Sequence, residues 1–157
     1  MNNTRAPKQL GDFGEGLITY LLIRKGFEVA YVDHVGADLI AERNRERWAI
    51  SVKLRLFKAG SAESKMVQVE SDNLKKLQAF ADRFAMHPAY AQIICDVDEK
   101  TIHAFLFKTA SVSQLLPTRK AGYSLRFGPK HLANLTGNPL IDYSSWQEQL
   151  ATTWFST

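Results

Sequence analysis

The sequence is poor in cysteine and in long apolar runs. Its 157 residues include one cysteine, Cys95, so no internal disulfide can form. This cysteine lies in the apolar run QIICDV, and we expect a buried thiol in a reducing, cytoplasmic compartment. No uninterrupted apolar stretch reaches the roughly 18 residues that a membrane-spanning helix needs. The N-terminal stretch MNNTRAPKQLGDFGEG also lacks the apolar segment of a secretory signal, so we expect no membrane partner.

Acidic residues are missing from one long segment. Between Lys100 and Ile141 there is no aspartate or glutamate, whereas six lysine and arginine residues occur there. The formal net charge of the chain is +4, so the remainder is slightly acidic. Segregated positive charge suits a surface that faces phosphates. A solvated loop region that happens to lack acids is the alternative, and charge alone does not decide between the two.

Internal repeats, low-complexity tracts and linkers rich in Pro, Gly or Ser are also absent from the sequence. A chain of this length can bury one hydrophobic core, whereas two independent cores would be cramped. We therefore expect a single domain over residues 1–157.

Hydrophobic periodicity predicts the order of the secondary-structure elements. Segment 58–70 is expected to be a loop with some extended structure. The expected helices cover 9–25, Ser71 to about 86 (ended by Pro88), 111–116, 129–135 and 143–154, and the expected strands cover 27–33, 37–43, 47–57, 91–97 and 101–107. The order of these elements is typical of a mixed α/β fold, in which helices pack on a short sheet.

Two neighbouring strands are expected to bring three polar residues together. Residues two apart in a strand share a face, so Ser51 and Lys53 point to one side, where Asp38 on the antiparallel neighbour can meet them. A lysine amine inside an apolar strand is costly to bury unless an acid lies close. A metal-dependent phosphodiesterase needs such a pair, because carboxylates hold a divalent cation while a lysine orients or deprotonates the attacking water.

The segments GDFGEGLITYLLIRKGFEV, GADLIA and WAISVKLR, in this order, resemble the PD-(D/E)XK nuclease superfamily, most closely its Holliday-junction-resolvase-like branch. That branch begins with a helix bearing Gly-x-x-Gly/Ala-Glu. It then shows Gly-x-Asp-hydrophobic-hydrophobic-Ala and a strand with acid-x-Lys. The match covers about residues 10–107. It implies a restriction-endonuclease-like core (helix, three-strand antiparallel meander, helix, two further strands). Charge and hydrophobic periodicity predict a basic, mostly helical extension after it, over about 108–157.

The resemblance also implies roles for individual residues. Glu15 matches the helix glutamate that helps to hold metal, Asp38 the metal-binding aspartate and Lys53 the catalytic lysine. Ser51 stands where the second metal-binding acid belongs. The implied cofactor is Mg²⁺, with Mn²⁺ as a substitute. The implied activity is hydrolysis of DNA by a homodimer, on branched or otherwise non-standard DNA, and RNA stays open as a substrate.

The serine leaves two outcomes open. Certain restriction endonucleases of this superfamily also carry Ser-x-Lys and recruit a glutamate from the following helical segment. Glu63 and Glu70 are the candidates here, and Glu70, just before the second helix, is better placed. Otherwise the metal site lacks a ligand and is catalytically impaired, and the chain is a nucleic-acid-binding or accessory protein of the same fold. A third alternative, from another class, is a protein-interaction domain whose basic segment meets an acidic partner.

Phosphate contacts are expected from basic residues, several of which are interleaved with the aromatic residues Tyr123 and Phe127. The candidates are Arg55, Arg119, Lys120, Arg126 and Lys130. Two of the site residues also have plainer explanations. Glu15 suits the positive end of an early helix, and Lys53 could extend its amine from an edge strand into water.

Overall fold

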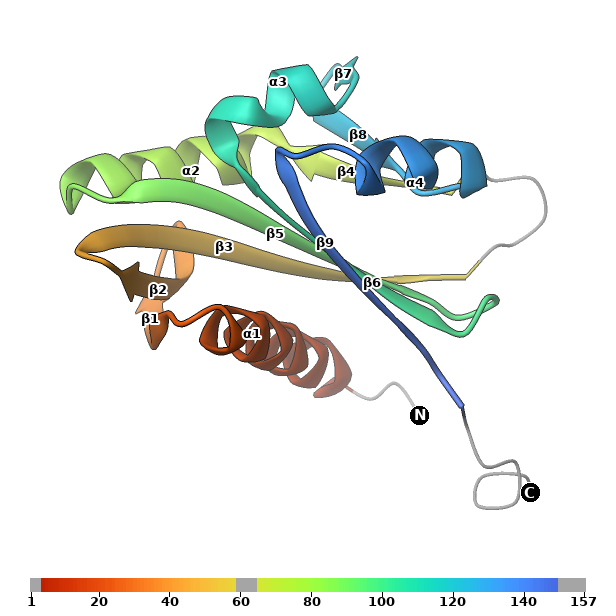
Figure 1. The fold of residues 1–157 in the computed structure, drawn as a ribbon, viewed down its shortest axis with the longest axis horizontal. Helices are drawn as coiled ribbons and strands as arrows, with labels where there is room; N and C mark the ends of the chain where they lie inside the picture. Colours follow the sequence, from red (N-terminus) through yellow and green to blue (C-terminus); the bar gives the residue numbers. More distant parts are fainter. Residues whose placement is uncertain (1–3, 59–64, 150–157) are drawn as a thin grey trace.

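The computed structural model describes residues 4–58 and 65–149. Its main feature is a six-stranded sheet with the strand order β1-β2-β3-β5-β6-β9 (Figure 1). Its strands are β1 Glu28–His34, β2 Ala37–Arg43, β3 Glu46–Phe57, β5 His87–Asp96, β6 Thr101–Lys108 and β9 Ile141–Gln147. The pair β3–β5 is parallel and the other four neighbouring pairs are antiparallel. The expected mixed α/β fold, with its three-strand antiparallel meander, is confirmed.

Tight turns connect the strands of the meander. Asn44 and Arg45 join β2 to β3 with φ values of 54° and 66°, the left-handed conformation of a two-residue hairpin. Gly36 joins β1 to β2 with φ of 109°. A Cβ atom at Gly36 would collide with the carbonyl oxygen of Lys76 on the second helix. Only glycine therefore allows that helix to pack directly on the β1–β2 turn.

A crossover explains why β3 and β5 are parallel. The chain leaves β3, forms the short strand β4 (Met66–Glu70) and the helix α2 (Ser71–Arg83), and returns as β5. Such a connection brings the next strand back in the same direction. Every residue of β5 from Ala89 to Asp96 is buried. Burial on both faces of β5 explains why its sequence is a near-continuous apolar run.

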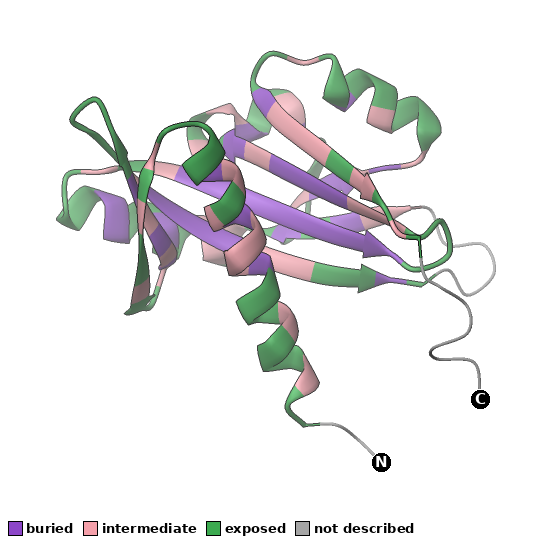
Figure 2. Cartoon of the chain, turned by 60° about the horizontal axis from the view of Figure 1, so that its bottom comes forward, coloured by how far each residue is buried: buried purple, intermediate pink, exposed green. Residues whose placement is uncertain are grey.

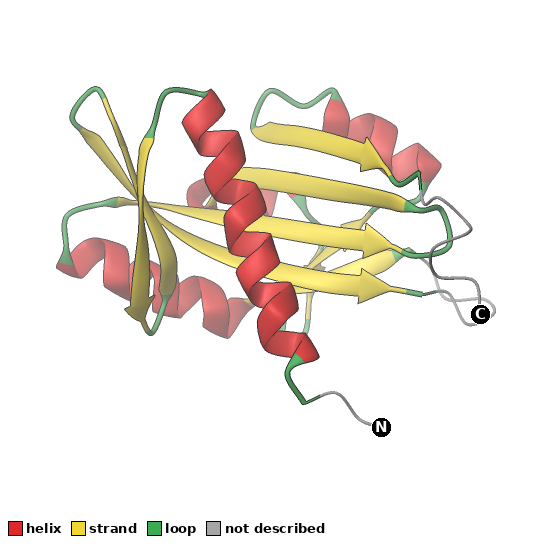
Figure 3. Cartoon of the chain, turned by 90° about the horizontal axis from the view of Figure 1, so that it is seen from below, coloured by secondary structure: helices red, strands yellow, loops and turns green. Residues whose placement is uncertain are grey.

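Helices and a smaller sheet cover the two faces of the main sheet. The long helix α1 (Ala6–Arg24) crosses one face obliquely (Figures 1 and 3). The other face carries α2, the three-stranded sheet β4-β8-β7 and two short helices (Figure 1). The additional elements are β7 Thr118–Arg119, β8 Gly122–Arg126, the 3₁₀ turn η1 Thr109–Ser111, α3 Val112–Leu115 and α4 Pro129–Thr136. The molecule therefore has three layers.

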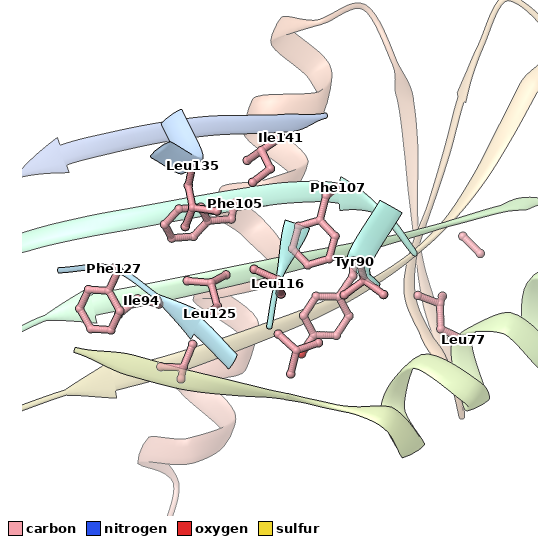
Figure 4. Packing of buried hydrophobic residues seen from close by; sticks show 14 of the residues in the cluster. Leu77, Tyr90, Ile94, Phe105, Phe107, Leu116, Leu125, Phe127, Leu135 and Ile141 are labelled. Carbon is pink, nitrogen blue, oxygen red and sulfur yellow. The ribbon is translucent and has the colours of Figure 1, made fainter. Parts of the chain in front are cut away.

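Two apolar layers, one on each face of the sheet, hold these elements together. Beneath α1, Ile18 and Leu22 pack against strand residues such as Ile93. On the other face, α2 and the small sheet enclose the larger cluster around Tyr90 and Phe105 (Figure 4). Figure 2 shows the buried residues concentrated in the central strands. Burial of apolar area at about 25 cal/mol per Å² is the main force that fixes this arrangement.

The C-terminal part differs from the expectation. Residues 143–147, expected to begin a helix, belong to β9, which pairs antiparallel with β6 along its length. Tyr143 and Trp146 are better suited to strands than to helices, and the open edge of β6 offers them a hydrogen-bonding partner. The described part of the extension is therefore not mostly helical, whereas residues 150–157 lie outside the described residues. The two short helices expected over 111–116 and 129–135 are confirmed as α3 and α4.

Two other details were wrong or missed. Pro88 does not end the second helix, because α2 already ends at Arg83 and Pro88 lies near the start of β5. The strands β7 and β8 were not anticipated. β8 pairs with β4 between Met66↔Arg126 and Glu70↔Gly122, so the small sheet joins two distant segments. Short strands that pair over such distances carry little local signal.

Candidate active site

The candidate site lies where β2 separates from β3. The ladder between these strands runs from Arg43↔Glu46 to Leu39↔Ile50, while β3 continues to Phe57 beside β5. At this point the Asp38 carboxylate accepts the backbone N–H of Val52 at 2.6 Å through Oδ2. The side chain of Asp38 therefore satisfies a backbone donor of β3 where the ladder has ended, which holds the carboxylate against the strand.

Lys53 lies beside this carboxylate. Its Nζ is 3.6 Å from Asp38 Oδ2, and the two side chains are 30% and 26% exposed. The predicted juxtaposition of the aspartate and the lysine across adjacent strands is therefore confirmed. Because the pair is only half-buried, each charge is stabilised by the other while the site stays open to a solute.

Ser51 completes the contacts of the same oxygen. Its Oγ donates to Asp38 Oδ2 at 3.3 Å, and the residue is only 3% exposed. A second carboxylate at position 51 would repel Asp38 unless a cation lay between them. The serine instead adds a hydrogen bond without adding a charge.

Glu15 belongs to α1, which packs on the face of β3 opposite α2. Its neighbour Gly14 lies so close to the sheet that a Cβ there would be 3.3 Å from both Leu54 Cβ and Ile93 Cδ1. Burial raises the pKa of Glu15, and the carboxylate of Asp38 raises it further, while Lys53 lowers it. The three groups therefore act on one another electrostatically.

Two residues of β5 that the sequence did not single out also belong to this region. Tyr90 is paired with Ser51 in the parallel ladder, and Gln92 with Lys53. The buried amide of Gln92 donates to the carbonyl oxygen of Lys53 at 3.2 Å, and the Tyr90 hydroxyl donates to Gln92 Oε1 at 3.4 Å. A glutamine inside the apolar run AQIICDV was the available signal, because a buried amide must find partners.

The pKa of Tyr90 indicates which charges surround this region. Burial raises that pKa; Arg55 lowers it, and Glu70 and Asp38 raise it. Arg55 and Glu70 therefore lie within electrostatic range of the same hydroxyl as Asp38. Glu70 is exposed, at the junction of β4 and α2. The other candidate acid, Glu63, lies outside the described residues.

The described acids of the site offer few ligands for a divalent cation. Within residues 4–58 and 65–149, no three His, Cys, Asp or Glu residues are grouped closely enough to hold a metal ion. However, Mg²⁺ in phosphoryl-transfer sites is usually held by one or two carboxylates, with water and substrate phosphates as further ligands. Both hydrogen bonds to Asp38 from the described residues are accepted by Oδ2, so Oδ1 can serve as a ligand. Asp38 and Glu15, whose carboxylates influence each other electrostatically, are the described acids that could hold such an ion.

The predicted phosphate-binding residues lie in two places. Arg55 is exposed on β3, two residues beyond Lys53. The other four belong to the small sheet and α4: Arg119 on β7, Lys120 in the β7–β8 turn, Arg126 on β8 and Lys130 on α4. Of these four, Arg126 is half-buried and the others are exposed. No helix within the described residues is long and apolar enough to cross a membrane.

Comparison with known proteins identifies the fold. No protein-family model matches the sequence, and no curated protein matches it significantly. The chain is similar to the solved structure of Hjc, a Holliday junction resolvase from Archaeoglobus fulgidus, with a TM-score of 0.53 and 18% identity over 74% of this chain and 83% of that one. A bacterial homing endonuclease, I-Ssp6803I, matches with a TM-score of 0.48 and 9% identity over 84% and 88% of the two chains. The likeness to Hjc shows that the chain has the same restriction-endonuclease-like fold.

Proposed function

We propose that this protein is a metal-dependent nuclease that hydrolyses DNA phosphodiester bonds at the Asp38–Lys53 site. The observation that carries the proposal is the 3.6 Å approach of Lys53 Nζ to Asp38 Oδ2, with Ser51 donating to the same oxygen. An aspartate and a lysine held side by side on adjacent strands suit metal-assisted hydrolysis of a phosphodiester. The fold shared with a Holliday junction resolvase supports the same function.

Each residue of the site has a distinct part in the proposal. Asp38 and Glu15 would hold Mg²⁺ or Mn²⁺, and Glu70 would supply the acid missing at Ser51. When bound, the metal lowers the pKa of a water molecule and neutralises charge on the phosphate. Lys53 orients that water or stabilises the charge that develops on the phosphoryl oxygens. Val52 N–H and Ser51 Oγ keep Asp38 Oδ2 in place.

The substrate we propose is branched or otherwise non-standard DNA, because the resolvase of the same fold is named for a four-way junction. Two strands of a junction must be cut, so a homodimer with two sites is the expected active form. The exposed Arg55, two residues beyond Lys53, would contact a neighbouring phosphate.

A second candidate function is DNA binding without cleavage. It is favoured by the sparse set of acids, since the described residues include no group of three ligating side chains at this site or elsewhere. In that case Ser51 marks the loss of a ligand, and the basic residues carry the remaining function.

A cleavage assay separates the two candidates. Duplex, single-stranded and four-way-junction DNA would be incubated with the protein in Mg²⁺, in Mn²⁺ and in EDTA. We expect metal-dependent cutting that falls by at least about 100-fold in Asp38→Asn and in Lys53→Met. Asp33→Asn and Lys58→Met are the matched controls, because they remove the same charges at exposed positions of β1 and just after β3.

The assay can also fail in two informative ways. Cutting that survives both Asp38→Asn and Lys53→Met would place the active site elsewhere. Salt-dependent DNA binding without cutting by the wild-type protein in either metal would establish the second candidate instead.

A further inference from the structure

A small recess lies between β8, α4 and the segment after α3. We call it the β8–α4 recess. It has a volume of about 170 Å³. Its polar lining consists of Ser124, Arg126, His131 and Asn134, and Leu116 and Leu135 form its apolar floor. It is built from other elements than the Asp38–Lys53 site and shares no residue with it.

Two polar groups of the recess lack a hydrogen-bond partner. Ser124 is 0% exposed, and its Oγ makes no hydrogen bond with the described residues. The buried Nε of Arg126 is in the same situation. Only one further buried side-chain atom in the described parts of the chain is unpaired, Thr19 Oγ1 on α1. A buried polar group without a partner costs free energy, so two of them in residues that line one recess indicate a bound water molecule or polar ligand there.

The charge around the recess favours a negatively charged ligand. No acid occurs between Lys100 and Ile141, the segment that supplies all the residues of the recess. The guanidinium of Arg126 therefore has no carboxylate within its own segment, whereas Lys25, Lys53 and Lys65 all pair with aspartates. The Ser124 hydroxyl, the Arg126 guanidinium and the Asn134 amide can all donate. Donors around an uncompensated positive charge suit an oxyanion.

The size of the recess limits that oxyanion. Sites for drug-sized molecules usually measure about 300–1,000 Å³, so 170 Å³ is too small for a nucleoside and sufficient for a phosphate group. The floor residues Leu116 and Leu135 are 4% and 8% exposed, whereas His131 and Asn134 at the rim are exposed. A phosphate inside a strand has two ester links and cannot enter such a recess without bending the strand. A terminal phosphate has one link and about two negative charges.

We propose that the β8–α4 recess binds a phosphate monoester, the terminal phosphate of a nucleic-acid strand, through Arg126 and Ser124. Free inorganic phosphate offers the same chemistry and is the other source. The recess would anchor a strand end apart from the place of cutting. The proposal does not depend on cleavage at Asp38 and Lys53, because it concerns binding alone.

The test compares oligonucleotides that differ only in their ends. Fluorescence anisotropy at fixed ionic strength would measure the affinity for the same labelled single strand carrying a 5′-phosphate, a 3′-phosphate or only hydroxyl groups. One or more charge-assisted hydrogen bonds predict that a terminal phosphate tightens binding by about tenfold or more. In Arg126→Gln this preference disappears, and in Ser124→Ala it falls several-fold. A separate titration with inorganic phosphate, followed by ³¹P NMR, tests the free ion.

Arg119→Gln is the matched control, because it removes the same charge from an exposed position on β7 that does not line the recess. We expect it to weaken binding of all three oligonucleotides equally and to preserve the preference. Thermal unfolding of each variant checks folding, and Ser124→Ala removes only an unpaired hydroxyl, so it should not lower the midpoint. Equal wild-type affinity for all ends, together with no binding of inorganic phosphate, would overturn the proposal. Binding of inorganic phosphate that Arg126→Gln abolishes, without a preference among ends, would support the recess with the free ion as its ligand.

Discussion

The Asp38–Lys53 site and the β8–α4 recess are two polar regions built on opposite charge arrangements. In the first, acids and a lysine neutralise one another, and Asp38 Oδ2 accepts from Ser51 and Val52. In the second, Arg126 and Ser124 have no acid nearby in the sequence, and polar atoms of both are unpaired. The comparison teaches that the two regions would treat a nucleic acid differently. Carboxylates suit a metal ion that would activate a water molecule for attack on phosphate, whereas cations without an acid partner bind phosphate without activating a nucleophile.

Two substitutions, one in each region, test whether the regions act separately. Asp38→Asn should lower the rate of junction cleavage by at least about 100-fold while DNA affinity without metal stays the same or rises. Arg126→Gln should lower the affinity for phosphorylated ends while the rate of cleavage at saturating DNA is unchanged. Single-turnover rates and anisotropy measured on the same preparations would check both. A variant that lowers both quantities equally would show that the regions act as one site.

The role of Ser51 can be sharpened by restoring the acid. Ser51→Asp would place a second carboxylate beside Asp38, where Ser51 Oγ now lies 3.3 Å from Oδ2. In EDTA, like-charge repulsion at this buried position should cost about 2 kcal/mol, or about 4–8 °C in the thermal midpoint. Mg²⁺ should reverse the loss, because a ligand that binds the folded state stabilises it.

Ser51→Asn is the control for that prediction, since it has nearly the same shape as the aspartate variant and no charge. Its midpoint should not respond to Mg²⁺ more than that of the wild type. If Mg²⁺ stabilises neither the wild type nor Ser51→Asp, the cation does not bind beside Asp38.

Salt dependence distinguishes paired from unpaired cations. Arg119→Gln and Lys120→Gln should each reduce the slope of log affinity against log salt by about one, because each exposed cation that contacts phosphate releases about one counterion. Lys8→Gln should change nothing, since Lys8 already pairs with Asp12 at 2.9 Å on α1. Anisotropy titrations at several salt concentrations measure the slopes, and an equal effect of all three substitutions would refute the distinction.

The smallest effect concerns the stability of the first region. Burial and Asp38 raise the pKa of Glu15 above its ordinary value of 4.5, so the folded protein holds this proton more tightly than the unfolded chain does. Ionisation of Glu15 therefore opposes folding. The wild type should lose stability relative to Glu15→Gln as the pH rises above that value, and the difference should vanish below about pH 4, where both states are protonated.

Thermal unfolding of the wild type and Glu15→Gln across this pH range checks the sign. Glu42→Gln, the same substitution at an exposed position on β2, is the control, because Glu42 is not among the groups that shift the pKa of Glu15. If the stability of the wild type instead increases relative to that of Glu15→Gln as the pH rises, Lys53 stabilises the ionised Glu15 more than burial and Asp38 disfavour it.

Local signals in the sequence were sufficient for the first half of the fold. The strand expected over 37–43 has those bounds in the structure, and the long first helix and the meander are also present. Apolar alternation and turn residues such as Asn44 report on neighbours only a few positions away, and these elements pair within a few residues. The same alternation was enough to place Asp38 and Lys53 on one face, which the 3.6 Å contact confirms.

Other features arose only when distant segments met. β9 is a strand because the edge of β6 was free to pair with it, and β8 because β4 lies alongside it, neither of which local propensity reveals. Likewise, Gln92 contacts the Lys53 carbonyl through a parallel ladder between residues 39 positions apart. The recess exists because α4 folds over β8 and encloses Ser124 and Arg126. Hydrophobic periodicity along the chain was thus sufficient to predict which residues share a face of a strand. The contacts between distant segments required the folded molecule, because backbone pairing and burial are set by partners far away in sequence.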